Sequence, residues 1–151
     1  MQNTLIPLLL VGSLLGGTSL AADRSDGNKS AAGEQMTIKM GPKVFTATLA
    51  DNATATAFKA MLPLTVKMDD LNDNEKVIRL PNNLPTDDSN PGHIHAGDLM
   101  IWSSRSLVLF YKTFPTSYSY TRLGRIDDAA GLSAAVGSGS VMVTYELKPG
   151  R

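Results

Sequence analysis

The fold of this chain is decided by one stretch, residues 97–126, which reads GDLMIWSSRSLVLFYKTFPTSYSYTRLGRI. Two apolar runs, at 99–102 and 107–111, are separated by a pair of serines, and an alternating run at 118–122 follows a proline. This pattern predicts three consecutive strands, of which the middle one has no polar face. A strand that is apolar on both faces is usually buried on both faces. We therefore expect the rest of the chain to wrap around residues 107–111.

Shorter alternating runs predict five more strands, and two short segments favour helices. The expected strands are 36–40, 43–49, 64–68, 76–80 and 138–147, and the expected helices are 53–61, with Asn52 as its N-cap, and 128–132, capped by Asp127. Many short strands without a strand–helix–strand rhythm indicate a barrel or a sandwich, and eight strands close around an interior that side chains can fill. The predicted fold is all-β: a closed eight-stranded barrel with two short helices.

Composition excludes several classes of function. The chain has 151 residues, with 14 basic and 14 acidic side chains, so no net charge attracts it to nucleic acid or to an anionic membrane. It contains no cysteine, which rules out thiol catalysis, disulfides and cysteine-ligated metals. We expect a monomeric domain that uses no cofactor.

The N-terminus is typical of an exported protein. Residues 5–15 form an uncharged apolar run, and the small residues of 16–21 favour cleavage after Ala21, although the first four residues lack Lys and Arg. A buried N-terminal helix is the alternative. We predict a signal peptide at 1–21, a disordered polar spacer at 22–34 and the barrel domain at 35–149. The mature protein is then periplasmic or secreted, with no membrane attachment.

Four stretches carry a resemblance to a known family, and together they span most of residues 36–147. The sequence resembles a bacterial cyclophilin-like family of small uncharacterised proteins, and the segment at 118–132 is similar to the place in true cyclophilins where a strand ends in Gly-x-Val/Ile before a short helix. The resemblance implies a cyclophilin-like barrel. The matching stretches are FTATLADNATATAFKAMLPLTVKM, EKVIRLPNNLP, GDLMIWSSRSLVLFYKTF and YSYTRLGRIDDAAGL.

True cyclophilins isomerise X-Pro peptide bonds, for which an arginine polarises the amide and an apolar pocket holds the proline ring. The resemblance places that arginine at Arg79 and makes Phe110 its aromatic partner. The family's Phe-His-Arg reads Val77-Ile78-Arg79 here, and its following Phe-Met-x-Gln is replaced by LPNNLP. A weak prolyl isomerase is therefore an alternative function rather than the first.

His93 and His95 form the most metal-like pair in the sequence. Residues two apart in a strand share a face, so both imidazoles could meet one ion, with Asp87, Asp88 or Asp98 adding an oxygen ligand. A loop histidine pair without a metal is the commoner outcome. A metal-binding barrel is therefore a further alternative, and no metal site is favoured.

The preferred function is an exported binding module for a peptide or small molecule whose identity the sequence does not name. Tyr118 and Tyr120 share a face of the expected third strand with Arg122, and Trp102 is the chain's single tryptophan. Aromatic side chains at this spacing can line a shallow groove, although they can equally cover the end of a barrel. We expect these four residues to contact the ligand, beside Arg79 and Phe110.

Overall fold

The computed structural model describes Ser30 and residues 33–149, and within them the chain forms ten strands and two helices. The elements are β1 (Gln35–Met40), β2 (Lys43–Leu49), α1 (Ala53–Lys59), β3 (Leu64–Leu71), β4 (Glu75–Arg79), β5 (His93–Ile94), β6 (Asp98–Trp102), β7 (Ser106–Phe110), β8 (Phe114–Pro115), β9 (Thr121–Ile126), α2 (Leu132–Val136) and β10 (Val141–Leu147). The predicted signal peptide and most of the predicted spacer lie outside the described residues and stay predictions. No helix of the described part is long and apolar enough to cross a membrane.

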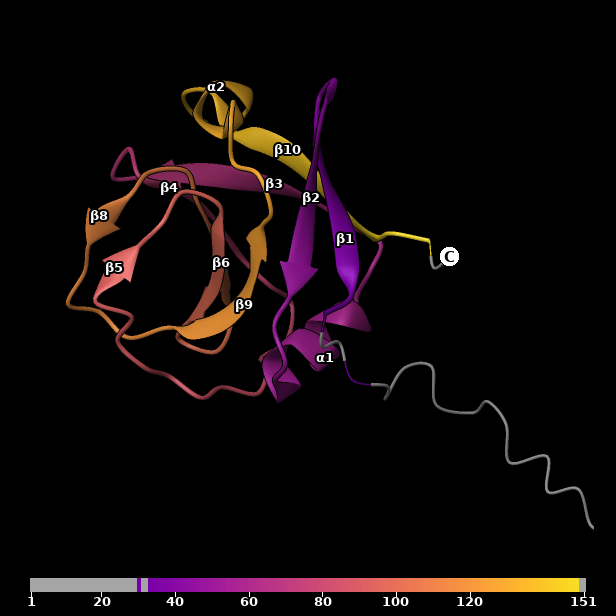
Figure 1. The fold of residues 1–151 in the computed structure, drawn as a ribbon, viewed down its shortest axis with the longest axis vertical. Coiled ribbons are helices and arrows are strands. Elements are labelled where there is room, and N and C mark those ends of the chain that lie inside the picture. Colours follow the sequence, from indigo (N-terminus) through magenta and orange to yellow (C-terminus); the bar gives the residue numbers. More distant parts are fainter. Residues whose placement is uncertain (1–29, 31–32, 150–151) are drawn as a thin grey trace, which may run out of the picture.

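Eight antiparallel strands close into a barrel, which confirms the predicted fold class. Their order around the barrel is β1-β10-β3-β4-β7-β6-β9-β2, and β2 returns to pair with β1. Figure 1 shows the two helices at opposite ends of the domain, α1 below β2 and α2 beside β10. At the crossing of β2 and β9 the backbones approach so closely that a Cβ on Gly124 would lie 2.6 Å from the Thr48 carbonyl oxygen. Packing against β2 therefore requires a glycine at position 124.

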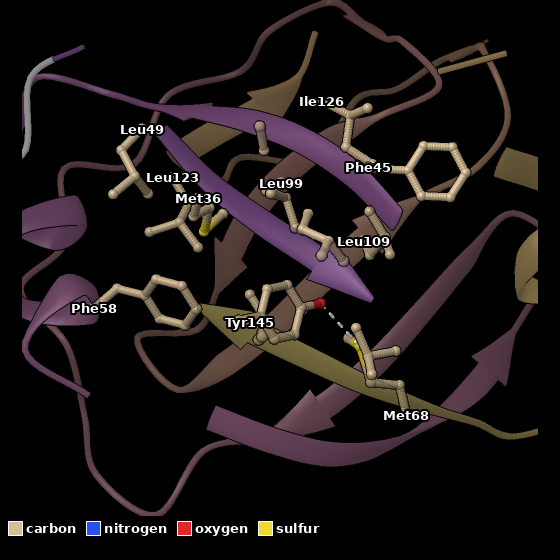
Figure 2. Close-up of a cluster of buried hydrophobic side chains, with 14 of the residues drawn as sticks. Met36, Phe45, Leu49, Phe58, Met68, Leu99, Leu109, Leu123, Ile126 and Tyr145 are labelled. Carbon is tan, nitrogen blue, oxygen red and sulfur yellow. Dashed lines mark hydrogen bonds between the residues drawn. The ribbon is translucent and has the colours of Figure 1, made fainter. Parts of the chain in front are cut away.

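Apolar side chains fill the barrel interior. Tyr145 on β10 is fully buried, donates a hydrogen bond from its hydroxyl to the sulfur of Met68 at 3.1 Å, and meets the edge of Phe58 from α1 at 5.8 Å between ring centroids (Figure 2). Val143 and Tyr145 lie on one face of β10, as their spacing predicts. Burial of large side chains of this kind supplies most of the stability of a domain without disulfides.

The outer face of β7 is also buried, as its sequence predicts. Leu107 and Leu109 point into the barrel, whereas Val108 and Phe110 belong to a second apolar cluster outside it. The short strands β5 and β8 pair with each other and cover this cluster with Ile94 and Phe114. Figure 1 shows this two-stranded sheet on the side of the domain away from β1.

The predicted third strand begins three residues too early. The sequence indicated a strand from Tyr118, but β9 starts at Thr121, and Tyr118 lies in irregular backbone. Pro115 is still paired with β5, and Tyr120 makes an isolated antiparallel bridge with Ser89, so pairing with remote residues overrides the local alternation. The two-stranded sheet itself was not predicted.

The two predicted helices differ in accuracy. Asn52 caps α1 as expected, since its side-chain oxygen accepts a hydrogen bond from the Ala55 amide at 2.7 Å, although the helix ends two residues early at Lys59. The second helix was predicted at 128–132 but forms at 132–136, after Gly131. Asp127 does not cap it, because its carboxylate accepts hydrogen bonds from Thr48 Oγ1 at 2.7 Å and Gln35 Nε2 at 3.0 Å.

A buried lysine closes one end of the barrel. Lys76 on β4 is fully buried, and its Nζ lies 3.0 Å from Asp70 Oδ1 and donates to the carbonyl oxygens of Gly137 and Gly139 at 2.8 and 2.6 Å. The ammonium also lies 5.3 Å from the centroid of the Tyr111 ring. These contacts tie the turn between α2 and β10 to the strands β3 and β4.

Lys76→Met is expected to lower the free energy of unfolding by about 2–4 kcal/mol, because methionine keeps the volume but leaves the Gly137 and Gly139 carbonyls without their donor. Denaturant unfolding measures the change. The matched control is Lys67→Met, at an exposed position on β3, which should change stability by less than about 0.5 kcal/mol. Equal effects of the two substitutions would contradict a structural role for the Lys76 ammonium.

Candidate functional site

A pocket of about 220 Å³ opens on the outer face of the barrel, over β4 and β7. It collects side chains from the β3–β4 hairpin, from strands β4, β6 and β7, and from the segment that precedes β9. The lining residues are Leu71, Asn72, Glu75, Val77, Trp102, Val108, Tyr118 and Tyr120.

Strand register sets the floor of the pocket. Val77 on β4 lies directly opposite Val108 on β7, and Glu75 shares the outer face with Val77 because residues two apart in a strand point the same way. Lys76, between them, points into the barrel instead. The floor is therefore apolar, with one carboxyl group at its end nearest the β3–β4 turn.

Aromatic side chains form the walls. Trp102 is 50 % exposed and Tyr118 is 66 % exposed, whereas Tyr120 is buried and packs edge-on against Phe110 with ring centroids 5.5 Å apart. The described residues include five large apolar side chains that are exposed, and three of them, Leu71, Trp102 and Tyr118, line this pocket. Exposed apolar side chains that gather around one concave site indicate a binding surface.

Glu75 is the charged group of the pocket, and it is only 8 % exposed. Its Oε2 atom is shielded from solvent and has no hydrogen-bond partner among the described residues. Burial raises the pKa of this carboxyl, the negative charge of Asp70 raises it further, and a hydrogen bond with the Asn74 side chain opposes the rise. The pocket thus holds a carboxylate whose surroundings do not neutralise it.

Asp70 keeps its own charge through other contacts. A hydrogen bond from the Tyr111 hydroxyl and the contact with Lys76 lower the pKa of Asp70, and the same hydrogen bond, after burial, contributes to the raised pKa of Tyr111. Asp70 therefore remains ionised near Glu75, and its charge is shared with groups that do not line the pocket.

Comparison with known proteins identifies the family. The model of the cyclophilin-like family matches residues 38–146, nearly the whole described domain. The chain belongs to the cyclophilin-like family. A search of curated proteins finds no match. The solution structure of a hypothetical protein from Archaeoglobus fulgidus shares the fold at 17 % identity and a TM-score of 0.54, and the alignment covers 81 % of this chain and 99 % of that one.

The resemblance to a cyclophilin-like family is thus confirmed, but the two residues carried over from the isomerases lie apart. Arg79 ends β4, is exposed and pairs with Ser106, whereas Phe110 is fully buried and lies four residues further along β7, about 13 Å away. Neither lines the pocket. Arg79 follows Val77 on the same outer face of β4 without lining the pocket, and the isomerase alternative stays an untested prediction.

The remaining predicted residues divide between the pocket and the surface. Trp102, Tyr118 and Tyr120 meet in the pocket, while Arg122 is exposed beside Met100 on the same outer side of the barrel and does not line it. Sequence reasoning placed the tyrosines on a strand face, whereas both lie in the segment before β9, where Tyr120 forms an isolated bridge with Ser89.

His93 and His95 are both exposed and flank the buried Ile94. Among the residues that the structure describes, no three His, Cys, Asp or Glu side chains lie close enough to share a metal ion. Asp98, which the sequence offered as a third ligand, is buried and accepts hydrogen bonds from Arg125 Nε and from the His95 amide, both at 2.8 Å. The Asp98 carboxylate is therefore already hydrogen-bonded within the protein, and the metal-binding alternative stays a prediction.

Sequence reasoning missed the floor and the carboxyl group of the pocket. None of Glu75, Val77 and Val108 was predicted as a site residue, although all three line the pocket. A signal was present, because strand alternation places Glu75 and Val77 on the same face as Arg79. What the alternation does not reveal is that Tyr118 and Tyr120, more than 40 residues later, cover that face.

Glu75→Gln is expected to raise the thermal unfolding midpoint at pH 7. The raised pKa means that the folded protein binds this proton more tightly than the unfolded chain does, so the ionised carboxyl destabilises the fold at neutral pH. The gain from glutamine should shrink as the pH falls through the raised pKa, and should vanish once Glu75 is protonated in both states. Circular dichroism melts between pH 3 and 8 would measure it.

The control for this series is Glu146→Gln, on β10 away from the pocket. Glu146 forms a surface ion pair with Lys39 at 3.4 Å, and such pairs contribute little to stability. A midpoint for Glu75→Gln that falls below that of the wild type at pH 7 would show that the carboxylate is stabilised by its surroundings.

Proposed function

We propose that this member of the cyclophilin-like family is a binding module that takes a small molecule or a peptide side chain into the pocket between Trp102, Tyr118 and the floor formed by Val77 and Val108. The observation that carries the proposal is the concentration of exposed apolar side chains around one concave site. Contact with an apolar ligand would remove these side chains from water, which is the main favourable term in most binding.

The pocket suits binding better than chemistry. Its lining includes one carboxyl group and two tyrosines, and neither a histidine nor a lysine lines it. General acid–base catalysis requires a positioned proton donor or acceptor at the reacting atom, and most hydrolytic mechanisms need two such groups. We therefore propose recognition rather than turnover, by a monomer.

We also propose that the domain works outside the cytoplasm, in the periplasm or as a secreted protein. The proposal is supported by the apolar run at 5–15 and the small residues that precede Ala22. A cysteine-free domain with a filled barrel core can fold in an oxidising compartment without forming incorrect disulfides.

Tyr118→Ala is expected to weaken ligand binding by roughly tenfold, since it removes an exposed ring that walls the pocket. A panel of aromatic and aliphatic fragments, with short proline-containing peptides, would be titrated while the fluorescence of Trp102 is recorded. The matched control is Met142→Ala, at another exposed large apolar residue, on β10, that does not line the pocket. Equal losses in both variants, or ligands that leave the Trp102 emission unchanged, would contradict this site.

Expression of the full chain in a Gram-negative host should yield a periplasmic protein whose first residue is Ala22, as measured by intact mass. Leu10→Arg should prevent processing, because a charge in the apolar run interrupts the segment that the export machinery reads. Leu5→Ile keeps the run apolar and serves as the control. Recovery of the uncleaved wild-type chain from the cytoplasm would overturn the proposed location.

A further inference from the structure

The Glu75 carboxylate indicates which chemical class of ligand suits the pocket. It is more than nine-tenths buried, it lines the pocket, and its Oε2 atom is without a hydrogen-bond partner among the described residues. Buried polar atoms in native proteins are nearly always paired, and an exception calls for a physical explanation, of which a functional role is one. A carboxylate in this position calls for a donor or a positive charge from outside the chain.

The lysine and arginine side chains near Glu75 in the described part of the chain do not pair with its carboxylate. Lys76 is the neighbouring residue in β4, but its ammonium is committed to Asp70, Gly137 and Gly139 inside the barrel. The exposed Arg79 and Arg122 lie on the same outer side of the barrel, and neither lines the pocket. The negative charge of Asp70 adds to the potential at Glu75, so the pocket favours a cation over a neutral group.

The walls select an organic cation over a metal ion. A metal ion requires several hard or nitrogen ligands, and besides the Asn72 amide the pocket offers a single carboxylate among valine, leucine and aromatic side chains. Indole and phenol rings attract alkylammonium groups through the negative electrostatic potential of their faces, and Trp is the most effective of them. Three such rings and one carboxylate line the same pocket.

We propose that the pocket binds an organic cation, with a positively charged nitrogen held between the Glu75 carboxylate and the rings of Trp102 and Tyr118. The volume of about 220 Å³ is below the range of drug-sized sites and suits a trimethylammonium group or one lysine side chain. This inference rests on the proposed function, because it names the chemistry of the ligand at that same site.

The test compares choline with 3,3-dimethyl-1-butanol, which has the same shape without the charge. Titration of the full mature protein, followed by Trp102 fluorescence, should show choline binding about tenfold or more tightly than the alcohol. Glu75→Gln should remove this preference, because choline loses its counter-charge and its affinity falls towards that of the alcohol. Glu146→Gln is the control and should preserve the preference.

Choline keeps its charge at every pH, so the pH dependence of its binding reports on the pocket alone. The groups that interact electrostatically with Glu75 are Asp70 on β3, Tyr111 after β7 and Tyr120 before β9, and both tyrosines have raised pKa values. Choline affinity should therefore rise as the pH increases through the raised pKa of Glu75 and then level off. The Glu75→Gln variant should lack this rise.

A second pair of probes distinguishes the source of the cation. Nα-acetyl-lysine methylamide and its uncharged norleucine analogue present the same backbone with and without the ammonium. Preference for the lysine derivative over choline would indicate a peptide ligand, whereas the reverse would indicate a small quaternary amine. Either preference supports the proposal when Glu75→Gln removes it.

Two outcomes overturn the inference. Equal binding of the charged and neutral partners of each pair would show that the pocket takes apolar groups alone, and the proposed binding module would stand without its cation. Absence of any choline or lysine-derivative binding at tens of millimolar, while neutral fragments from the panel do bind, would exclude a cationic ligand. Failure of the neutral fragments as well would count against the proposed function itself.

Discussion

Strand β7 has to remove apolar side chains from water on both of its faces. Leu107 and Leu109 achieve this inside the barrel, in company with the side chains of the other seven strands. Val108 and Phe110 point outward, and the closed barrel has nothing of its own to place over them. The chain therefore needs a cover outside the barrel, which β5, β8 and Tyr120 supply. The arrangement of the functional face follows from this second burial.

The cover formed by β5, β8 and Tyr120 is small, and the pocket lies where this cover ends. Strands β5 and β8 have two residues each, and they bury the end of β7 that carries Phe110. Towards Val108 and Val77 the apolar surface continues, but there it is bordered by Trp102 and Tyr118, which remain exposed. A surface of this kind is costly to leave in water and favourable to cover with a ligand. The site is thus a continuation of the same apolar face that the protein covers elsewhere with its own residues.

The fold was predictable because its main determinants are local. Two-sided apolarity of residues 107–111, the spacing of Val143 and Tyr145 in β10 and the Asn52 cap are each read from fewer than ten neighbouring residues. The errors arose where pairing with remote residues decided the conformation. Tyr118 and Tyr120 alternate like a strand, yet the bridge to Ser89 and the pairing of Pro115 with His93 delay β9 until Thr121. Three predicted binding residues nevertheless meet in the pocket, because aromatic side chains near an apolar face tend to lie at its border.

Glu75 shows why the rest of the site could not be predicted. In the sequence it ends an acidic turn and precedes a lysine, a context typical of exposed charges. Its burial depends on partners from other parts of the chain, since Val108 comes from β7 and Tyr118 and Tyr120 from the segment before β9. The adjacent Lys76 is buried too, but it is fully satisfied inside the barrel and stabilises the fold. Two neighbouring charges on opposite faces of one strand therefore have different roles. Lys76 ties the turn between α2 and β10 to β3 and β4, whereas the raised pKa of Glu75 means that ionisation of its carboxyl opposes folding, a cost that the proposed cation would reduce.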